Sequence, residues 1–110
     1  MIRQGSQGSI NFFYRNKMIC SRPLGERSYG NYKEMRNKVM REAFEAGWSI
    51  NSQIKFYRGF IKKIRYDKLL KQPTSDDWDV IACSILILIK LRDIDAHGDR
   101  EGLLICPRKK

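Results

Sequence analysis

A run of ten residues, 80–89, is apolar at every position except Ser84. Crossing a bilayer takes about 20 apolar residues in a helix, so a run of this length indicates a buried element of a globular domain rather than a membrane span. An element that is apolar on all sides has no face suited to water and has to be covered by its neighbours. The rest of the chain is therefore expected to fold around this segment.

The residues before the run carry the signals of a helix start. Thr74 or Ser75 can cap the first turn after Pro73, because a side-chain oxygen accepts a hydrogen bond from a free backbone N–H. Asp76 and Asp77 then lie at the positive end of the helix dipole. We predict a central helix from this cap to about Leu91. Four of its residues are expected to point inward: Trp78, Ile81, Ile85 and Leu88.

Periodicity predicts the remaining elements. We expect a strand over 10–15, a short second strand over 18–20, a loop over 22–31 and a helix over 32–46 that Gly47 ends. Segment 50–58 fits either a strand or a helical stripe; its alternation and Gly59 favour a strand. A polar loop over 93–100 and a last strand over 103–106 complete the chain. The fold class is then α+β, a small mixed sheet with two main helices packed on it.

The helix over 32–46 has an apolar stripe, with its basic residues away from the stripe's centre. The stripe, taken as the core-facing side, comprises Met35, Val39, Met40, Ala43 and Phe44, and the basic residues are Lys33, Arg36 and Arg41. A length of 110 residues suits one domain. We divide the chain into a flexible lead (1–8), one domain (9–106) and a basic tail (107–110).

The charge of the chain points to a polyanionic partner. Its 22 Lys and Arg exceed its 12 Asp and Glu by ten, which makes a field that attracts nucleic acid. The cations are densest over 55–71, where aromatic residues that could stack on bases lie between them. The alternative for this segment is a solvated face with half-buried aromatics. Candidate nucleic-acid-binding residues are Arg15, Arg22, Arg27, Lys55, Arg58, Lys62, Lys63, Arg65, Lys68 and Lys71.

Acidic residues gather at both ends of the central helix in this otherwise basic chain. Asp77 and Asp79, two residues apart, could hold a divalent cation together with a third carboxylate from Asp95 or Asp99. Mg²⁺ held in this way can activate water and stabilise charge on a phosphate. The alternative is that the first acids complement the helix dipole and the later ones are loop residues.

The cysteines and the histidine favour no structural site. Cys20, Cys83 and Cys106 are an odd number at wide spacing, which is not a disulfide framework, and no CxxC pair or second histidine joins His97 for zinc. Reduced thiols suggest a cytoplasmic or other reducing compartment.

The order of these pieces resembles the RusA family of Holliday-junction resolvases. The resemblance rests on an apolar residue before Asn-Phe-Phe-Tyr-Arg (11–15), on Tyr-Lys-Glu (32–34), Ala-Gly-Trp (46–48) and Gln-Ile-Lys-Phe-Tyr (53–57), and on Asp-Trp-Asp (77–79) followed by Asp99. It implies an α+β homodimer that cleaves four-way DNA junctions with Mg²⁺, with Asp77, Asp79 and Asp99 as catalytic residues. Cys83 stands where the family has a lysine, which favours a chain without catalysis.

Three functions therefore stay open. The first is a Mg²⁺-dependent, structure-selective DNA endonuclease, whose dimer would act on two symmetric strands. The second is a non-catalytic nucleic-acid-binding protein of phage or viral type. The third is a small inhibitor that binds an acidic protein surface. In the first two the partner is nucleic acid, DNA in preference to RNA, and no membrane is involved.

Overall fold

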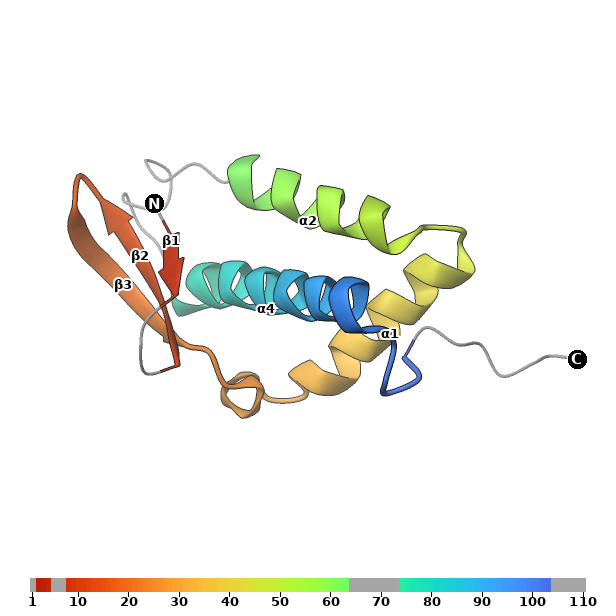
Figure 1. The fold of residues 1–110 in the computed structure, drawn as a ribbon. Helices are drawn as coiled ribbons and strands as arrows, with labels where there is room; N and C mark the ends of the chain where they lie inside the picture. Colours follow the sequence, from red (N-terminus) through yellow and green to blue (C-terminus); the bar gives the residue numbers. More distant parts are fainter. Residues whose placement is uncertain (1, 5–7, 64–73, 104–110) are drawn as a thin grey trace, which may run out of the picture.

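The computed structural model of the chain describes residues 2–4, 8–63 and 74–103. It is an α+β fold, as the sequence predicts, although its strands are all antiparallel rather than mixed, in the order β1-β2-β3. In Figure 1, α2 and α4 lie side by side, and the sheet covers the end where α4 begins. The elements are β1 (Ile2–Gln4), β2 (Ser9–Tyr14), β3 (Lys17–Pro23), η1 (Glu26–Tyr29), α1 (Tyr32–Glu45), α2 (Ile50–Lys63) and α4 (Ser75–His97).

Helix α4 is the centre of the core, as its apolar run predicts. Thr74 caps it, since its hydroxyl accepts a hydrogen bond from the Asp77 backbone N–H. The helix continues past the expected end at Leu91 because Ile94, three residues on, extends the buried row. Residues 93–97 are therefore helical rather than a loop. The buried residues of α4 are Trp78, Ile81, Ala82, Ser84, Leu86, Ile87, Leu88, Leu91 and Ile94; Ile85 is partly buried.

Strands β2 and β3 form a hairpin around a two-residue turn. Arg15 and Asn16 both have positive φ, 52° and 65°, as a turn that matches the right-handed twist of the strands requires. The turn lies one residue earlier than predicted. Strand β2 has the predicted length of six residues but begins one position earlier, whereas β3, with seven residues, is longer than the predicted 18–20. Ile10 and Phe12 point into the core, where the Phe12 ring lies 5.0 Å from that of Trp78. The hairpin thus anchors the sheet to the start of α4.

Strand β1 (Ile2–Gln4) lies within the segment expected to be a flexible lead. It pairs antiparallel with β2, with Ile2 opposite Phe12. The predicted last strand, 103–106, falls almost entirely outside the described residues; Leu103 is buried but is not in a strand. Across the described ranges, no helix combines the length and apolar character that crossing a membrane takes.

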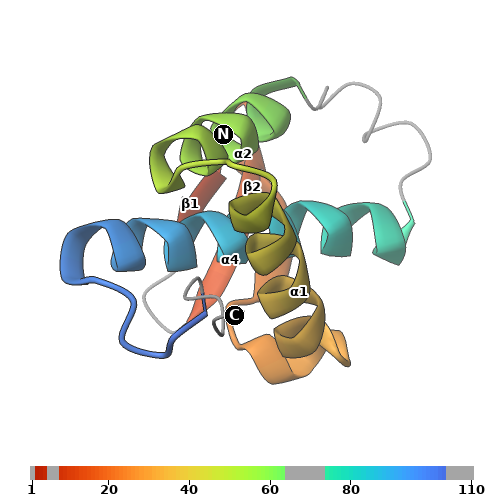
Figure 2. The ribbon, with the colours of Figure 1, turned by 90° about the vertical axis from the view of Figure 1, so that its right-hand side faces the viewer.

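Helix α1 has the predicted extent but a different buried face. Tyr32, Arg36 and Met40 are buried, whereas Met35 and Phe44 of the expected stripe are 40% and 41% exposed. Figure 2 shows why: α1 crosses α4 at a steep angle, so that only a narrow row at i, i+4 spacing faces the core. The helix ends in a Schellman motif, with the Trp48 N–H bonded to the Ala43 carbonyl and Gly47 at φ 94°, which confirms the predicted stop.

Segment 50–63 is helix α2, so the predicted strand over 50–58 is wrong. Ser49 caps the helix by accepting a hydrogen bond from the Ser52 N–H. The stripe of Ile54, Tyr57 and Ile61 packs on the core beside α4, and this burial outweighs the ~1 kcal/mol that a mid-helix glycine costs. The alternation of apolar and other residues over 54–57, which suggested a strand, arises by chance from residues that follow the helical spacing.

Candidate functional site

Asp77 completes the cap of α4. Its carboxylate accepts a hydrogen bond from the Thr74 N–H (2.9 Å), and its own N–H donates to the Thr74 hydroxyl (3.2 Å). This reciprocal capping box satisfies two backbone donors at the start of the helix. In the structure Asp77 therefore stabilises the start of α4. This is the role that the sequence analysis gave as the alternative to metal binding.

Asp79 is paired with Arg22, two residues that sequence reasoning assigned to different sites. Arg22 Nε donates to Asp79 Oδ1 at 3.0 Å, and a second guanidinium nitrogen donates to the Ser21 carbonyl. The pair is partly exposed and joins β3 to α4. Each charge therefore compensates the other, which reduces the value of Arg22 as a free cation and of Asp79 as a free carboxylate.

The proposed third carboxylate lies far from this pair. Asp79 and Asp95 are 16 residues apart on one helix, which at 1.5 Å per residue separates them by about 24 Å. Asp99 follows two residues after the helix end at His97, and two residues span about 7 Å at most, so it stays roughly 20 Å or more from Asp79. Within one chain the structure does not bring the three aspartates together, because α4 begins near Asp77 and Asp79 and ends near Asp95 and Asp99. The shared metal site therefore stays a prediction.

The acids at the far end have partners of their own. Asp93 and His97 pair at i, i+4 spacing (3.2 Å), and Asp99 Oδ1 accepts from the Leu103 N–H (2.8 Å). Within the parts of the chain that the structure describes, no three His, Cys, Asp or Glu side chains are grouped as a metal site would need.

Besides Arg22, the surroundings of Asp79 include a phenol and two thiols whose neutral forms are favoured. Burial, and then the charge of Asp79, raises the pKa of Tyr29 to about 12. Burial also raises the pKa of the Cys20 and Cys83 thiols, and both cysteines are free. Because the thiolate is the reactive form of cysteine, this environment does not favour nucleophilic chemistry.

The exposed side of α2 carries the strongest unbalanced charge among the described elements. We call Lys55, Arg58, Lys62 and Lys63 the basic ridge; all four are exposed, and the 14 residues of α2 include no acid. None of the four forms an ion pair with another described residue. Arg65, Lys68 and Lys71, the other cations predicted for this segment, lie outside the described residues.

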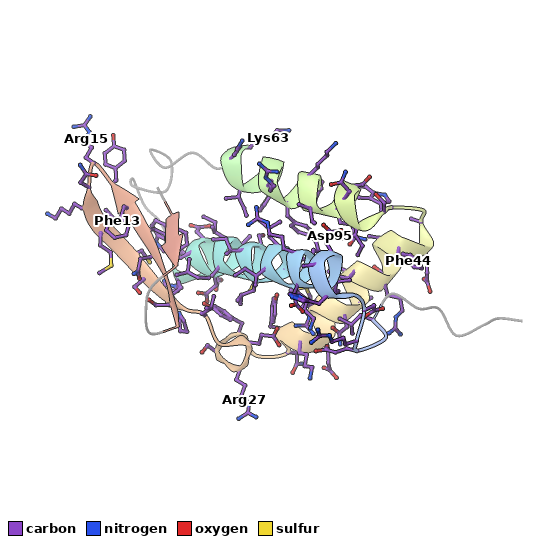
Figure 3. All side chains as sticks on the ribbon, viewed as in Figure 1. Phe13, Arg15, Arg27, Phe44, Lys63 and Asp95 are labelled. Atoms are coloured by element: carbon purple, nitrogen blue, oxygen red, sulfur yellow. The ribbon has the colours of Figure 1, made fainter. Side chains whose placement is uncertain are left out.

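The remaining predicted cations are divided between two sides of the molecule. In Figure 3, Arg15 at the hairpin tip and Lys63 at the end of α2 lie on the same side, whereas Arg27 of η1 points away on the opposite side. Arg15 is exposed and lies over the Tyr14 ring, 5.2 Å from its centroid. A ligand that contacts the basic ridge could therefore reach Arg15 without crossing the molecule, but not Arg27.

Sequence reasoning missed the buried Arg36 and its ion pairs with partly exposed carboxylates. This side chain, expected away from the core, is 2% exposed, donates to Glu26 and to Asn37 Oδ1 (2.9 Å), and lies 3.6 Å from Glu101. Lys90 also donates to Glu101 (2.8 Å) and lowers its pKa. The only sequence signal was the i, i+4 spacing of Tyr32, Arg36 and Met40. Because its carboxylate partners are within the chain, Arg36 serves packing rather than ligand binding.

Comparison with protein-family models, with curated proteins and with solved structures found no match to this chain. The resemblance to the RusA family therefore stays a prediction.

Proposed function

We propose that this protein binds nucleic acid, DNA in preference to RNA, through the basic ridge of α2. In this proposal its role is binding, and the protein catalyses no reaction on the nucleic acid. The observation that carries the proposal is the ridge itself: four exposed cations on one helix, with no acid on that helix and no described ion-pair partner. Cations placed in this way neutralise phosphates and release the counterions bound to them. Paired cations such as Arg22 and Arg36 would first have to give up a carboxylate.

The charge of the whole chain supports the same proposal. A net charge of +10 raises the local concentration of any polyanion and speeds its encounter with the protein. An inhibitor of an acidic protein would use the same charge, but α2 also exposes Phe56, 51% accessible, beside its cations. Aromatic surface among cations suits nucleic acid, whose bases can stack on it.

The test is a charge reversal on the ridge with a matched control elsewhere. Lys62→Glu/Lys63→Glu should weaken binding to DNA of any sequence and lower the slope of log affinity against log salt by about 1.8 on duplex, at about 0.9 per phosphate contact. Arg92→Glu/Arg100→Glu makes an equal change of charge at two exposed residues, one in the last turns of α4 and one just after it. Figure 1 shows that the end of α4 lies at the opposite end of the fold from the end of α2. Equal losses in both double variants would contradict an interface on α2.

The Mg²⁺-dependent nuclease activity remains a prediction, and a combined binding and cleavage assay tests it. A labelled four-way junction and a linear duplex are incubated with the protein, once with Mg²⁺ and once with chelator, and binding and cleavage are measured together. A non-catalytic protein binds in both conditions and cleaves in neither. Mg²⁺-dependent cleavage that Asp79→Asn abolishes would instead require a metal site completed by a second copy of the chain.

A further inference from the structure

A hollow of about 310 Å³ opens between the second half of α1 and the first half of α2. Three aromatic residues, Trp48, Phe56 and Tyr57, form much of its lining, with Gln53 and Glu42 as its polar residues. Its volume is at the lower end of the range of small-molecule sites, about 300–1,000 Å³. It lies beside the basic ridge, because Phe56 of its lining follows Lys55 on α2, about 100° around the helix.

The aromatic rings leave a large apolar surface uncovered. The Phe56 ring is nearly perpendicular to both neighbouring rings: its centroid is 5.6 Å from that of Trp48 at 82° and 5.1 Å from that of Tyr57 at 86°. Trp48 is 41% exposed and Phe56 51% exposed, although large apolar side chains are usually covered. Aromatic rings attract a planar group by stacking and by edge-to-face contact, so a lining of this kind suits a planar ligand.

Gln53 gives the hollow a hydrogen-bonding group without a partner. The residue is 2% exposed, and its Nε2 is a buried side-chain atom with no hydrogen-bond partner among the described residues. An unsatisfied buried donor destabilises a free protein, so each such case calls for an explanation. A ligand in the hollow provides one when the Gln53 side chain turns its amide toward an acceptor of that ligand, and Glu42 can accept a hydrogen bond from an amino group of the same ligand.

We infer that this hollow binds a nucleobase of a single-stranded nucleic acid whose phosphates lie along the basic ridge. The inference rests on the proposed function and narrows it to a substrate class. A base is planar, stacks on aromatic rings and presents an acceptor on its edge for Gln53. In a duplex this edge is paired and the faces are stacked, so the hollow favours an unpaired strand.

The test compares a short single-stranded DNA oligonucleotide with its abasic counterpart, which has the same phosphates and no bases. The wild-type chain should bind the base-containing strand about 5- to 150-fold more tightly, the ratio that stacking of one base gives. Trp48 fluorescence should be quenched only by the strand with bases. The other tryptophan, Trp78, is buried, so its fluorescence should not change when a strand binds.

Gln53→Met separates a binding role from a structural one. Methionine keeps the volume and removes the unpartnered amide, so the melting temperature should stay the same or rise. Affinity for the base-containing strand should nevertheless fall toward that for the abasic strand. Phe56→Ala should do the same, whereas Phe44→Ala, which removes a similarly exposed ring outside the hollow, should leave both affinities unchanged.

The outcomes distinguish this inference from the proposed function. Equal wild-type affinity for the two strands, or an unchanged affinity in Gln53→Met, would overturn the base site. If Lys62→Glu/Lys63→Glu still weakened binding in that case, the phosphate interface would stand without the hollow. If neither these strands nor a DNA duplex bound even at low salt, both proposals would fall.

Discussion

Asp79 on α4 and Arg22 on β3, 57 positions apart in the sequence, form an ion pair of 3.0 Å between Oδ1 and Nε. The pair links the hairpin to the first turns of the central helix. It also joins Asp79, a predicted metal ligand, to Arg22, a predicted phosphate-binding residue. Because each charge is compensated by the other, the geometry of one chain supports neither role.

The pair should contribute little stability, because both side chains are partly exposed to solvent. Asp79→Asn and Arg22→Gln are each expected to lower the free energy of unfolding by about 0.2–1 kcal/mol, and the double variant by less than the sum. Urea unfolding at low and high salt measures this, and salt should reduce the coupling. Additive losses would show that the two charges do not interact in solution.

The buried guanidinium of Arg36 should depend on Glu26 more than on Glu101. Glu26 forms a direct hydrogen bond with Arg36, whereas Glu101 lies 3.6 Å away and is 49% exposed. Glu26→Ala should therefore lower the free energy of unfolding by about 1–3 kcal/mol, and Glu101→Ala by less than about 1 kcal/mol. Chemical denaturation of both variants at neutral pH tests the order, and a larger loss for Glu101→Ala would reverse our assignment.

Sequence reasoning predicted those parts of the fold in which local pattern and tertiary packing agree. Helix α4 follows from its cap and its all-round apolar composition, and α1 follows from its stripe and Gly47. The buried face of α1 did not follow, because a steep crossing selects the row of Arg36 over that of Met35. Burial of an arginine depends on Glu26 and Glu101, which come from separate segments, so no local pattern contains it.

Stability should decline at alkaline pH through Tyr29. Its pKa rises from 10.0 to about 12 in the folded chain, so the folded state favours the neutral phenol. This contribution is fully present below pH 10 and is lost as the pH rises toward 12. Tyr29→Phe should therefore show a shallower fall in melting temperature over this interval than the wild type. Identical slopes would mean that Tyr29 titrates normally.

Two aliphatic residues of α4 test where the core lies. Leu91 is fully buried and Ile89 is 38% exposed on the same helix. Leu91→Ala should cost about 2–5 kcal/mol, because it removes apolar contacts and leaves a cavity. Ile89→Ala should cost much less, and Ile85→Ala, partly buried, should fall between them. Thermal and urea unfolding give the ranking; similar losses for Leu91 and Ile89 would show that α4 is rotated in solution.

The candidate site was less predictable than the fold. The cations of α2 and its aromatic residues were recognised from their density in the sequence. Residues 50–58 were nevertheless expected to form a strand, which would place Lys55 and Arg58 on opposite faces. Only the helix brings the ridge together and sets Phe56 against Trp48. Whether the amide of Gln53 has a hydrogen-bond partner depends on the side chains that α1 places opposite it. A single sequence does not show this arrangement.

Gly59 provides a direct test of the helical assignment of α2. Its backbone lies outside the left-handed region, and a Cβ built on it would meet nothing within 4 Å. Gly59→Ala should therefore stabilise the protein by about 0.5–1 kcal/mol, since alanine restricts the unfolded chain and favours a helix. Gly47→Ala is the matched contrast: at φ 94° a side chain is strained, so the same change should destabilise by about 1 kcal/mol. Thermal unfolding followed by circular dichroism measures both. A lower melting temperature for Gly59→Ala would mean that α2 does not run unbroken through this position.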